Sequence, residues 1–324
     1  MKKNILKITA LLAFGFLFVG CNEDFLETTP LSEVADANVW SDQKLAEAAV
    51  LDLYQGTWAG TLTREETTDA FTDQAVFTHP GRGVDGYTEG KMNPAGNFMD
   101  MQWFSWPELY PFIRSANNAI QKLTLNEAGM EASLVNRLLG EAYFMRGYYY
   151  TQLMRQFGGV VLTLEPLTLD SEASNPRATF AETVNQILSD LDRAIDLLED
   201  APRDPARADK ITALAMKSRV LTHVASDLYE PSKNSGVSTI ASYSNPELIG
   251  WTSGSQLQRW EAAKVASKAL LDATTGYKLD YTSPASHDEA IQNYEDIWLQ
   301  GDQNQDFIWG RLVEEFGFGS RTYP

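Results

Sequence analysis

The side chains that most often carry enzymatic chemistry are few in this sequence and widely spaced. The chain has three histidines, which lie far apart: His79, His223 and His287. They lack the His-Glu-x-x-His spacing that places two zinc ligands on one helical face. Glu65, Glu66 and Asp69 could supply the two carboxylates of a glycosidase, which must lie about 5–5.5 or 6.5–9.5 Å apart. Such clusters are expected by chance among 44 acidic residues, so we expect neither catalysis nor a cofactor.

A second candidate is a calcium loop near the end of the chain. The Asp-x-Asn-x-Asp triplet at 302–306 matches the first three ligand positions of an EF-hand. Phe307 then occupies the position of the turn glycine, and Val313 stands where the loop needs a bidentate glutamate. We therefore interpret this segment as a polar turn in front of a short strand at 307–309, and we expect no metal site.

Cys21 is the only cysteine, and it follows a segment built like an export signal. Lysines near the start are followed by an apolar run from Ile8 to Val19, as in a secretory signal peptide. Residues 17–21 resemble a bacterial lipobox, in which the cysteine becomes the lipidated first residue of the mature protein. We expect residues 1–20 to be removed and Cys21 to be lipidated. An ordinary cleaved signal followed by an unmodified cysteine is the alternative.

The charge of the chain limits the ligands it can attract. The sequence holds 44 acidic and 26 basic residues, for a formal net charge of −18. Because residues 1–20 contain three lysines and no acidic residue, their removal would change this charge to −21. A surface this acidic repels phosphate backbones, which argues against nucleic-acid binding. It also disfavours sulfated or uronic-acid polymers, unless a local basic pocket overrides the global field.

Helical periodicity dominates the chain after its first forty residues. Apolar side chains recur three and four positions apart, as on the buried face of an amphipathic helix. The predicted helices are 41–54, 106–123, 132–157, 179–201, 209–229 and 259–273.

Several helix ends carry recognisable capping residues. Ser41 is the expected N-cap of the first helix, and Thr179 with Glu182 forms a capping-box pattern at the fourth. The glycine pair 158–159 is expected to end the third helix, and residues 160–162 are predicted to be a short extended piece.

The spacing of these helices predicts the architecture. Helices that begin at intervals of roughly 30–50 residues indicate stacked pairs like those of tetratricopeptide arrays. We therefore expect a mainly all-α fold of tetratricopeptide-like helix pairs, with long irregular loops and a few short strands. Separate antiparallel helices without true repeats are the alternative.

Two long segments, 59–105 and 230–258, lack helical periodicity. Long irregular loops in a compact domain are usually either functional or disordered, and the aromatic residues of 59–105 favour an ordered, functional surface there. A ring on such a surface can stack on the C–H face of a sugar, while polar neighbours bond its hydroxyls. The predicted ligand-binding residues combine three rings with four polar partners: Phe77, Tyr87, Trp251, Asp73, His79, Arg82 and Asn97.

Other aromatic and amide side chains fit a structural role better than a ligand site. The tyrosines at 148–150 occupy core spacings of a predicted helix, so we expect them to be packed. We expect Asn117 and Asn118 to bond loop backbone and to pin the long loop 59–105 to its helix.

Three stretches resemble the SusD/RagB family of glycan-binding outer-membrane lipoproteins. Residues 106–120 follow its Trp-x-x-x-Tyr-x-x-Ile-x-x-Ala-Asn helix. Residues 140–162 resemble its Ala-x-Phe-x-Arg-Ala-Tyr-Tyr-Tyr helix and the Tyr-Gly-Gly-x-Pro turn behind it, with Gly147 for the alanine and Val161 for the proline. Residues 260–279 are similar to a third family helix.

The resemblance implies four tetratricopeptide-like units, ligand-binding loops on one face and no catalysis. It also implies a lipid anchor in the cell outer membrane, facing the exterior. There the protein would bind oligosaccharides or other nutrients and pass them to a TonB-dependent transporter of the SusC type. A tetratricopeptide-like scaffold that binds a protein partner and no glycan is the alternative.

The same comparison predicts the domain organisation. We expect a signal peptide at 1–20, a tether at 21–40, a helical domain at 41–280 and the start of an incomplete C-terminal region at 281–324. Family chains are longer than this one, and residues 316–324 resemble a mid-chain segment. Residues from about 281 onward are therefore expected to be poorly tied to the helical array.

Overall fold

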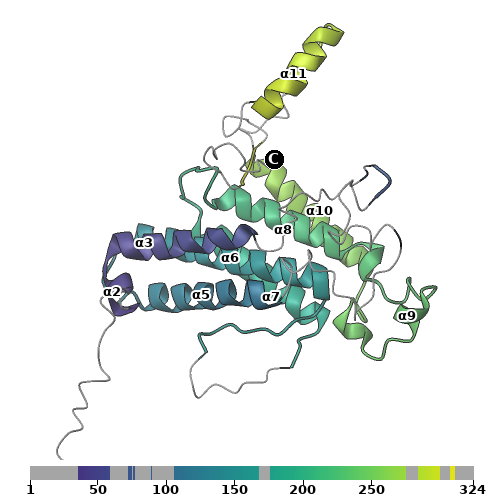
Figure 1. The fold of residues 1–324 in the computed structure, drawn as a ribbon, viewed down its shortest axis with the longest axis horizontal. Helices are drawn as coiled ribbons and strands as arrows, with labels where there is room; N and C mark the ends of the chain where they lie inside the picture. Colours follow the sequence, from purple (N-terminus) through teal and green to yellow (C-terminus); the bar gives the residue numbers. More distant parts are fainter. Residues whose placement is uncertain are drawn as a thin grey trace, which may run out of the picture.

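All regular secondary structure in the described part of the chain is helical. The computed structural model describes residues 36–58, 72–74, 76, 89, 106–167, 176–274, 284–299 and 307–310. The helices, shown in Figure 1, are α2 (Asp36–Ser41), α3 (Gln43–Asp52), η3 (Leu53–Trp58), α5 (Trp106–Leu125), α6 (Ala132–Phe157), α7 (Phe180–Leu197), α8 (Lys210–Val224), η6 (Asp227–Tyr229), α9 (Ser238–Ala241), η7 (Pro246–Leu248), α10 (Gln256–Ala273) and α11 (His287–Leu299).

Consecutive helices pack on one another around α6. Helix α6 lies between α5 and α7, α8 packs on α7, and α10 packs on α8, while α3 lies along α5 and α6 (Figure 1). Of the 26 residues of α6, 16 are buried, including the three tyrosines at 148–150. These tyrosines are core residues, as predicted. The arrangement is the expected stack of helix pairs.

Local sequence explains where most helices begin and end. The predicted bounds of α6 are confirmed, and Gly158 ends it with a positive φ of 75°, a conformation that glycine adopts without strain. The capping box at the start of α7 is also confirmed, since Thr179 and Glu182 each accept a hydrogen bond from the other's backbone N–H.

The predicted cap of the first long helix is wrong by one residue. Asp42 caps α3, because its carboxylate accepts hydrogen bonds from the N–H groups of Lys44 and Leu45. Ser41 instead ends α2, where its hydroxyl donates to the carbonyl of Asn38. A second difference is at α10, which begins three residues earlier than predicted, behind Ser255 as N-cap.

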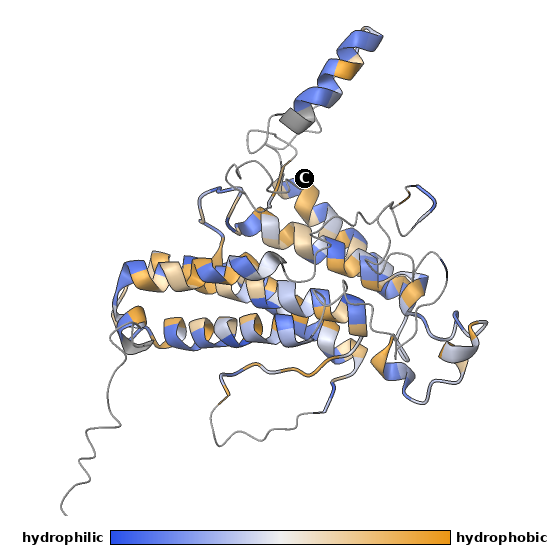
Figure 2. Cartoon of the chain, viewed as in Figure 1, coloured by the Kyte–Doolittle hydropathy of each residue, from blue (hydrophilic) through white to orange (hydrophobic). Residues whose placement is uncertain are grey.

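Helix α11 was not predicted as a helix, and the short strands expected from the sequence are absent from the described residues. Helix α11 projects away from the helical layers (Figure 1), and most of it is coloured as hydrophilic in Figure 2. Residues 160–162 are extended, with the carbonyl of Val160 accepting from the N–H of Ala178, but they form no strand. Residues 307–310 also form no strand.

The segment 307–310 packs on the bundle, so the expectation of weak contacts after residue 281 is wrong there. The ring of Trp309 lies 5.2 Å from Phe144 and 5.7 Å from Tyr148, in edge-to-face geometry. The guanidinium of Arg203 donates to the carbonyl of Phe307 at 2.6 Å. Trp309 docks this distant segment on α6, and hydrogen bonds to the connection between α7 and α8 hold it from the other side.

A buried ion pair joins α6 to α7 and to the connection between them. Arg146 donates to both carboxylate oxygens of Asp190, at 2.9 and 2.6 Å. It also donates to Asn117 on α5 at 2.8 Å and to the carbonyl of Leu164 at 3.1 Å. Burial by itself lowers the pKa of Arg146, but the hydrogen bonds and charge of Asp190 outweigh burial and raise it.

Asn117 bonds loop backbone, as predicted, but in a different loop. Its amide donates to the carbonyl of Thr163 at 2.8 Å, so it holds the connection after α6. The predicted partner, the loop 59–105, lies almost entirely outside the described residues.

A second buried cluster fixes α3 and the connection before α8. The carboxylate of Glu141 on α6 is buried and accepts from Arg207 at 2.7 Å and from the Tyr54 hydroxyl at 2.8 Å. Arg207 also pairs with Glu47 at 2.6 Å. Three segments that are distant in sequence are thus held by one carboxylate.

None of the described helices combines the length and the apolar composition that a membrane span requires.

Candidate functional site

The structure describes only two of the predicted ligand-binding residues. Asp73 is exposed in a turn at 72–74, and Trp251 is half-buried just before α10. The other predicted residues lie outside the described part of the chain, as does the predicted lipidation site: Phe77, His79, Arg82, Tyr87, Asn97 and Cys21.

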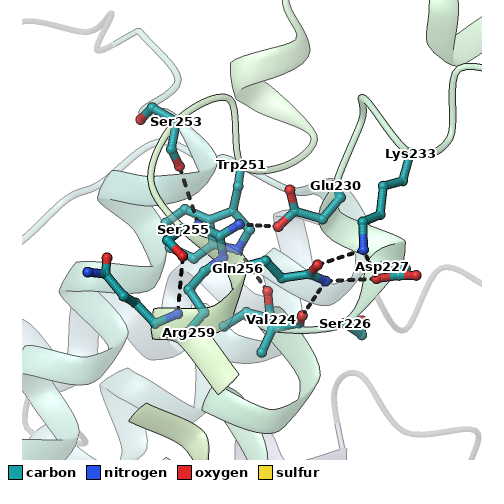
Figure 3. A network of polar contacts seen from close by, with 12 residues as sticks. Val224, Ser226, Asp227, Glu230, Lys233, Trp251, Ser253, Ser255, Gln256 and Arg259 are labelled. Atoms are coloured by element: carbon teal, nitrogen blue, oxygen red, sulfur yellow. Dashed lines mark hydrogen bonds and ion pairs between the residues drawn. The ribbon is translucent and has the colours of Figure 1, made fainter. Parts of the chain in front are cut away.

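Trp251 is held by contacts on several sides. Its indole N–H donates to the carbonyl of Val224 at 2.7 Å, and its ring meets Phe180 edge-on at 5.3 Å. The guanidinium of Arg259 lies 4.7 Å from the ring centroid (Figure 3), within the range of a cation–π contact. The ring therefore has a fixed orientation and keeps part of its surface exposed.

A polar network around Trp251 orders the segment 226–259 (Figure 3). Arg259 forms an ion pair with Glu230. Gln256 donates to Asp227 at 2.7 Å and accepts from Lys233 at 2.7 Å. The hydrogen bonds from Lys233 and Gln256 lower the pKa of Asp227. Residues 230–258 were predicted to lack helical structure and to join the loop 59–105 at the ligand site. The structure instead gives them two short helices, α9 and η7, and their polar side chains help to order them.

A cavity of about 440 Å³ opens between α6, α8 and the segment 307–310. Phe144, Tyr148 and Trp309 form one wall, where their rings meet edge to face. The polar part of the lining comes from α6 and α8, and it consists of Thr151, Gln152, Arg155, Thr212, Arg219 and His223. None of the described residues that line this cavity is acidic, although acidic residues outnumber basic ones in the chain.

Two exposed arginines line this cavity, Arg155 from the last turn of α6 and Arg219 from α8. Burial, and then the charges of Arg155 and Arg219, lower the pKa of His223 below its ordinary value. Burial raises the pKa of Tyr148, and the same two arginines oppose that rise. Both guanidinium charges therefore act on the pKa values of the same two side chains, His223 and Tyr148.

Within the described part of the chain, neither arginine has a carboxylate within ion-pair distance. Arg155 donates to the side-chain oxygen of Gln152 at 3.1 Å. The His223 ring nitrogen is 2.9 Å from the Tyr229 hydroxyl. The cavity thus offers positive charge and hydrogen-bond donors beside an aromatic wall.

Sequence reasoning missed this cavity. His223 was considered only as a metal candidate, and Tyr148 only as a core residue. The weak signal was one arginine on each of two predicted helices, but nothing local indicates that Arg155 and Arg219 line the same cavity. Among the described residues, no group of three or more histidine, cysteine, aspartate or glutamate side chains could hold a metal ion.

The class of protein follows from the helical stack and from a family comparison. Residues 24–221 match the SusD-like family model, described as "Starch-binding associating with outer membrane". The chain belongs to this family, which confirms the resemblance read from the motifs at 106–120 and 140–162. The mainly helical fold predicted from the sequence is confirmed as well.

The relatives include named SusD-like proteins. The chain is 30% identical over 247 residues to a SusD-like protein of Formosa agariphila, covering 74% of this chain and 46% of that one. It is 23% identical to a SusD-like protein of Bacteroides ovatus, covering 66% and 38%. The chain therefore spans less than half the length of these curated relatives.

Solved structures share the fold. A SusD-like protein from Bacteroides fragilis matches with a TM-score of 0.58 at 25% identity, covering 87% of this chain and 46% of that chain. A SusD superfamily protein from Bacteroides thetaiotaomicron matches with a TM-score of 0.58 at 20% identity, covering 84% and 53%.

Proposed function

We propose that this protein is an outer-membrane lipoprotein that binds oligosaccharides or other nutrients and passes them to a SusC-like TonB-dependent transporter. The observation that carries the proposal is the family match over residues 24–221. That family is described as starch-binding and associated with the outer membrane. The transporter partner and the outward orientation rest on the family resemblance alone.

The helical stack suits a protein that presents loops to a ligand without catalysing a reaction. The ion pairs of Arg146 and Arg207 hold two connections against α6, the one after α6 and the one before α8, so loops that leave the stack start from fixed points. Trp251 adds an oriented ring beside a polar network. A structure with the same fold, 15% identical and with a TM-score of 0.51, was solved with a xylogluco-oligosaccharide.

The lipid anchor can be tested separately from ligand binding. Replacing Cys21 by alanine removes the only cysteine, so the Cys21→Ala protein should neither incorporate radioactive palmitate nor enter the detergent phase. Cys21→Ser, which is nearly the same size, serves as a second variant without a thiol. Equal membrane association of all three forms would refute lipidation at this residue.

Calorimetry with a neutral glycan panel tests the predicted ligand site. If Phe77, Tyr87 and Trp251 stack on sugar rings, replacing each by alanine should weaken binding of the cognate glycan about tenfold, because a buried aromatic face contributes through its area. Trp260→Ala is the matched control, because Trp260 is exposed on α10 outside both loops. Trp251→Ala also removes contacts to Phe180, so a thermal melt accompanies that measurement.

Affinities unchanged for all three loop variants would refute the site assignment. Absence of binding to the whole panel would favour the alternative function, a scaffold that binds a protein partner. One observation favours that alternative: apolar side chains are exposed along α10, including Leu257 at 78% and Leu271 at 70%. Retardation in native gels containing each glycan separates the two functions, since only a glycan-binding protein is retarded.

A further inference from the structure

We propose that the cavity between α6, α8 and the segment 307–310 is a second ligand site, which binds a sugar acid by its carboxylate through Arg155 and Arg219. The inference does not rest on the capture of neutral oligosaccharides by the loops, because it uses none of the residues assigned to that site. The size of the cavity, its charge and its lining each restrict the class of ligand that it can bind.

The size of the cavity fits a small molecule. Its volume of about 440 Å³ lies within the roughly 300–1,000 Å³ of pockets that bind small molecules. Its walls come from two helices of the rigid stack and from a segment docked by Trp309. The site is therefore held by packed elements.

The charge of the cavity selects an anion. Its described lining contains two arginines and no acidic residue. A guanidinium group binds a carboxylate with charge-assisted hydrogen bonds that are stronger than those between neutral groups. In a chain with 44 acidic residues, two arginines without a carboxylate partner in the described structure are available for a ligand's negative charge.

The global field limits how much negative charge the ligand carries. The chain has a formal net charge of −18, which opposes each negative charge that approaches. Two guanidinium groups can balance a single carboxylate against that field more readily than a doubly charged phosphate or a polyanion. His223 adds no full positive charge at pH 7, because its pKa is lowered. A monoanion is therefore the best match.

The rest of the lining fits the ring and hydroxyl groups of a sugar. The rings of Tyr148 and Trp309 supply aromatic surface, on which the C–H face of a pyranose can pack. The side-chain amide of Gln152 and the ring of His223 supply hydrogen-bonding groups near the arginines. A sugar with one carboxylate, such as a uronic acid residue, combines a single negative charge, a C–H face and hydroxyl groups.

Isothermal titration of the full chain with sodium glucuronate tests the proposal, with glucose at the same ionic strength as the neutral comparison. We expect one bound glucuronate per chain and at least tenfold weaker binding of glucose. Arg155→Gln and Arg219→Gln should each weaken glucuronate binding about tenfold, because each removes a charge-assisted hydrogen bond. Added sodium chloride should also weaken it.

Arg114→Gln is the matched control, because Arg114 is exposed on α5 and does not line the cavity. It should bind glucuronate as the unmodified protein does. Neither Arg155 nor Arg219 has an ion pair in the described structure, so melting temperatures of all three variants should agree. The loop variants Phe77→Ala and Tyr87→Ala should also bind glucuronate normally, which separates this proposal from the loop site.

Three results would overturn the inference. Equal binding of glucuronate and glucose would exclude recognition of the carboxylate. The double variant Arg155→Gln/Arg219→Gln could bind glucuronate with unchanged affinity, which would exclude this cavity. Tighter binding of inorganic phosphate than of glucuronate would show that the site does not select a sugar acid.

Discussion

The buried pair of Arg146 and Asp190 offers the sharpest test of how the helical stack is held. Its side chains are only 6% and 1% exposed, and Arg146 donates four hydrogen bonds, to Asp190, Asn117 and Leu164. Replacing Arg146 by methionine keeps much of the side-chain volume. It leaves the carboxylate of Asp190 buried with one remaining donor, the amide of Gln186 at 2.9 Å.

We expect Arg146→Met to lower the free energy of unfolding by about 3–5 kcal/mol, the usual result of removing one partner of a buried ion pair. Two carbonyl acceptors, the side chain of Asn117 and the backbone of Leu164, also lose their donor. Because a typical domain is stable by about 5–15 kcal/mol, the loss would be a large share of the total.

The double variant Arg146→Met/Asp190→Leu separates the loss of the pair from the effect of an unpaired charge. Burying two charges is itself unfavourable, so an apolar pair of similar volume is expected to be more stable than Arg146→Met alone. Denaturant unfolding measures all three proteins. Hydrogen exchange at 161–167 should rise in Arg146→Met, because Arg146 and Asn117 hold that connection.

Lys264→Met is the control for this series, since Lys264 and its partner Glu261 are 74% and 60% exposed. Exposed ion pairs contribute little, so this variant should unfold at the same denaturant concentration as the unmodified protein. A loss below about 1 kcal/mol for Arg146→Met would refute the argument that this buried pair holds the helices together.

Three further predictions follow from particular positions. Gly147→Ala should stabilise the protein by about 0.5–1 kcal/mol, because a Cβ there makes ordinary contacts at 3.4 Å. Gly140→Ala should destabilise it, because its Cβ would lie 2.6 Å from Leu198. Equal melting temperatures for the two variants would contradict this prediction. Trp309→Phe should be nearly neutral, because the buried indole N–H has no acceptor among the described residues, while Trp309→Ala should lose roughly 2–4 kcal/mol in denaturant titrations. The folded-state pKa of His223 is lowered, so its contribution to stability is present above its unfolded pKa of 6.5 and is lost as pH falls through the folded value. His223→Gln should therefore flatten the pH dependence of the free energy of unfolding between those two pKa values. An unchanged slope would show that His223 does not cause this pH dependence.

The helices could be predicted because their signals are local. The core stripe and the glycine at 158 define α6 from the sequence alone, and Thr179 with Glu182 defines the start of α7. The error at Ser41 has the same local origin, because Asp42 beside it is an equally good cap and α2 takes Ser41. Helix α11 was missed although Ile291 and Tyr294 lie on one helical face, since the residues after 281 were expected to be poorly tied to the helical array.

The ligand sites could be predicted only in part. Residues of a proposed loop site can be chosen by type, as Asp73 and Trp251 were, but the indole N–H bond to Val224 and the Arg259 contact depend on the fold. The position of Trp309 was also beyond sequence reasoning, which predicted a strand there. Its place against Phe144 is set by the packing of distant segments.

The sequence by itself determined the class of this protein, because helix periodicity, helix caps and the motifs around Arg146 depend only on residues that are close together in the sequence. Only the tertiary structure decided that Arg146 pairs with Asp190 and that Arg155 and Arg219 line one cavity, whose described lining holds no acidic residue. The physical reason is that a charge's partner depends on which helices pack together. Periodicity indicates that a helix has a buried face, but it does not say which side chains of other helices that face will meet.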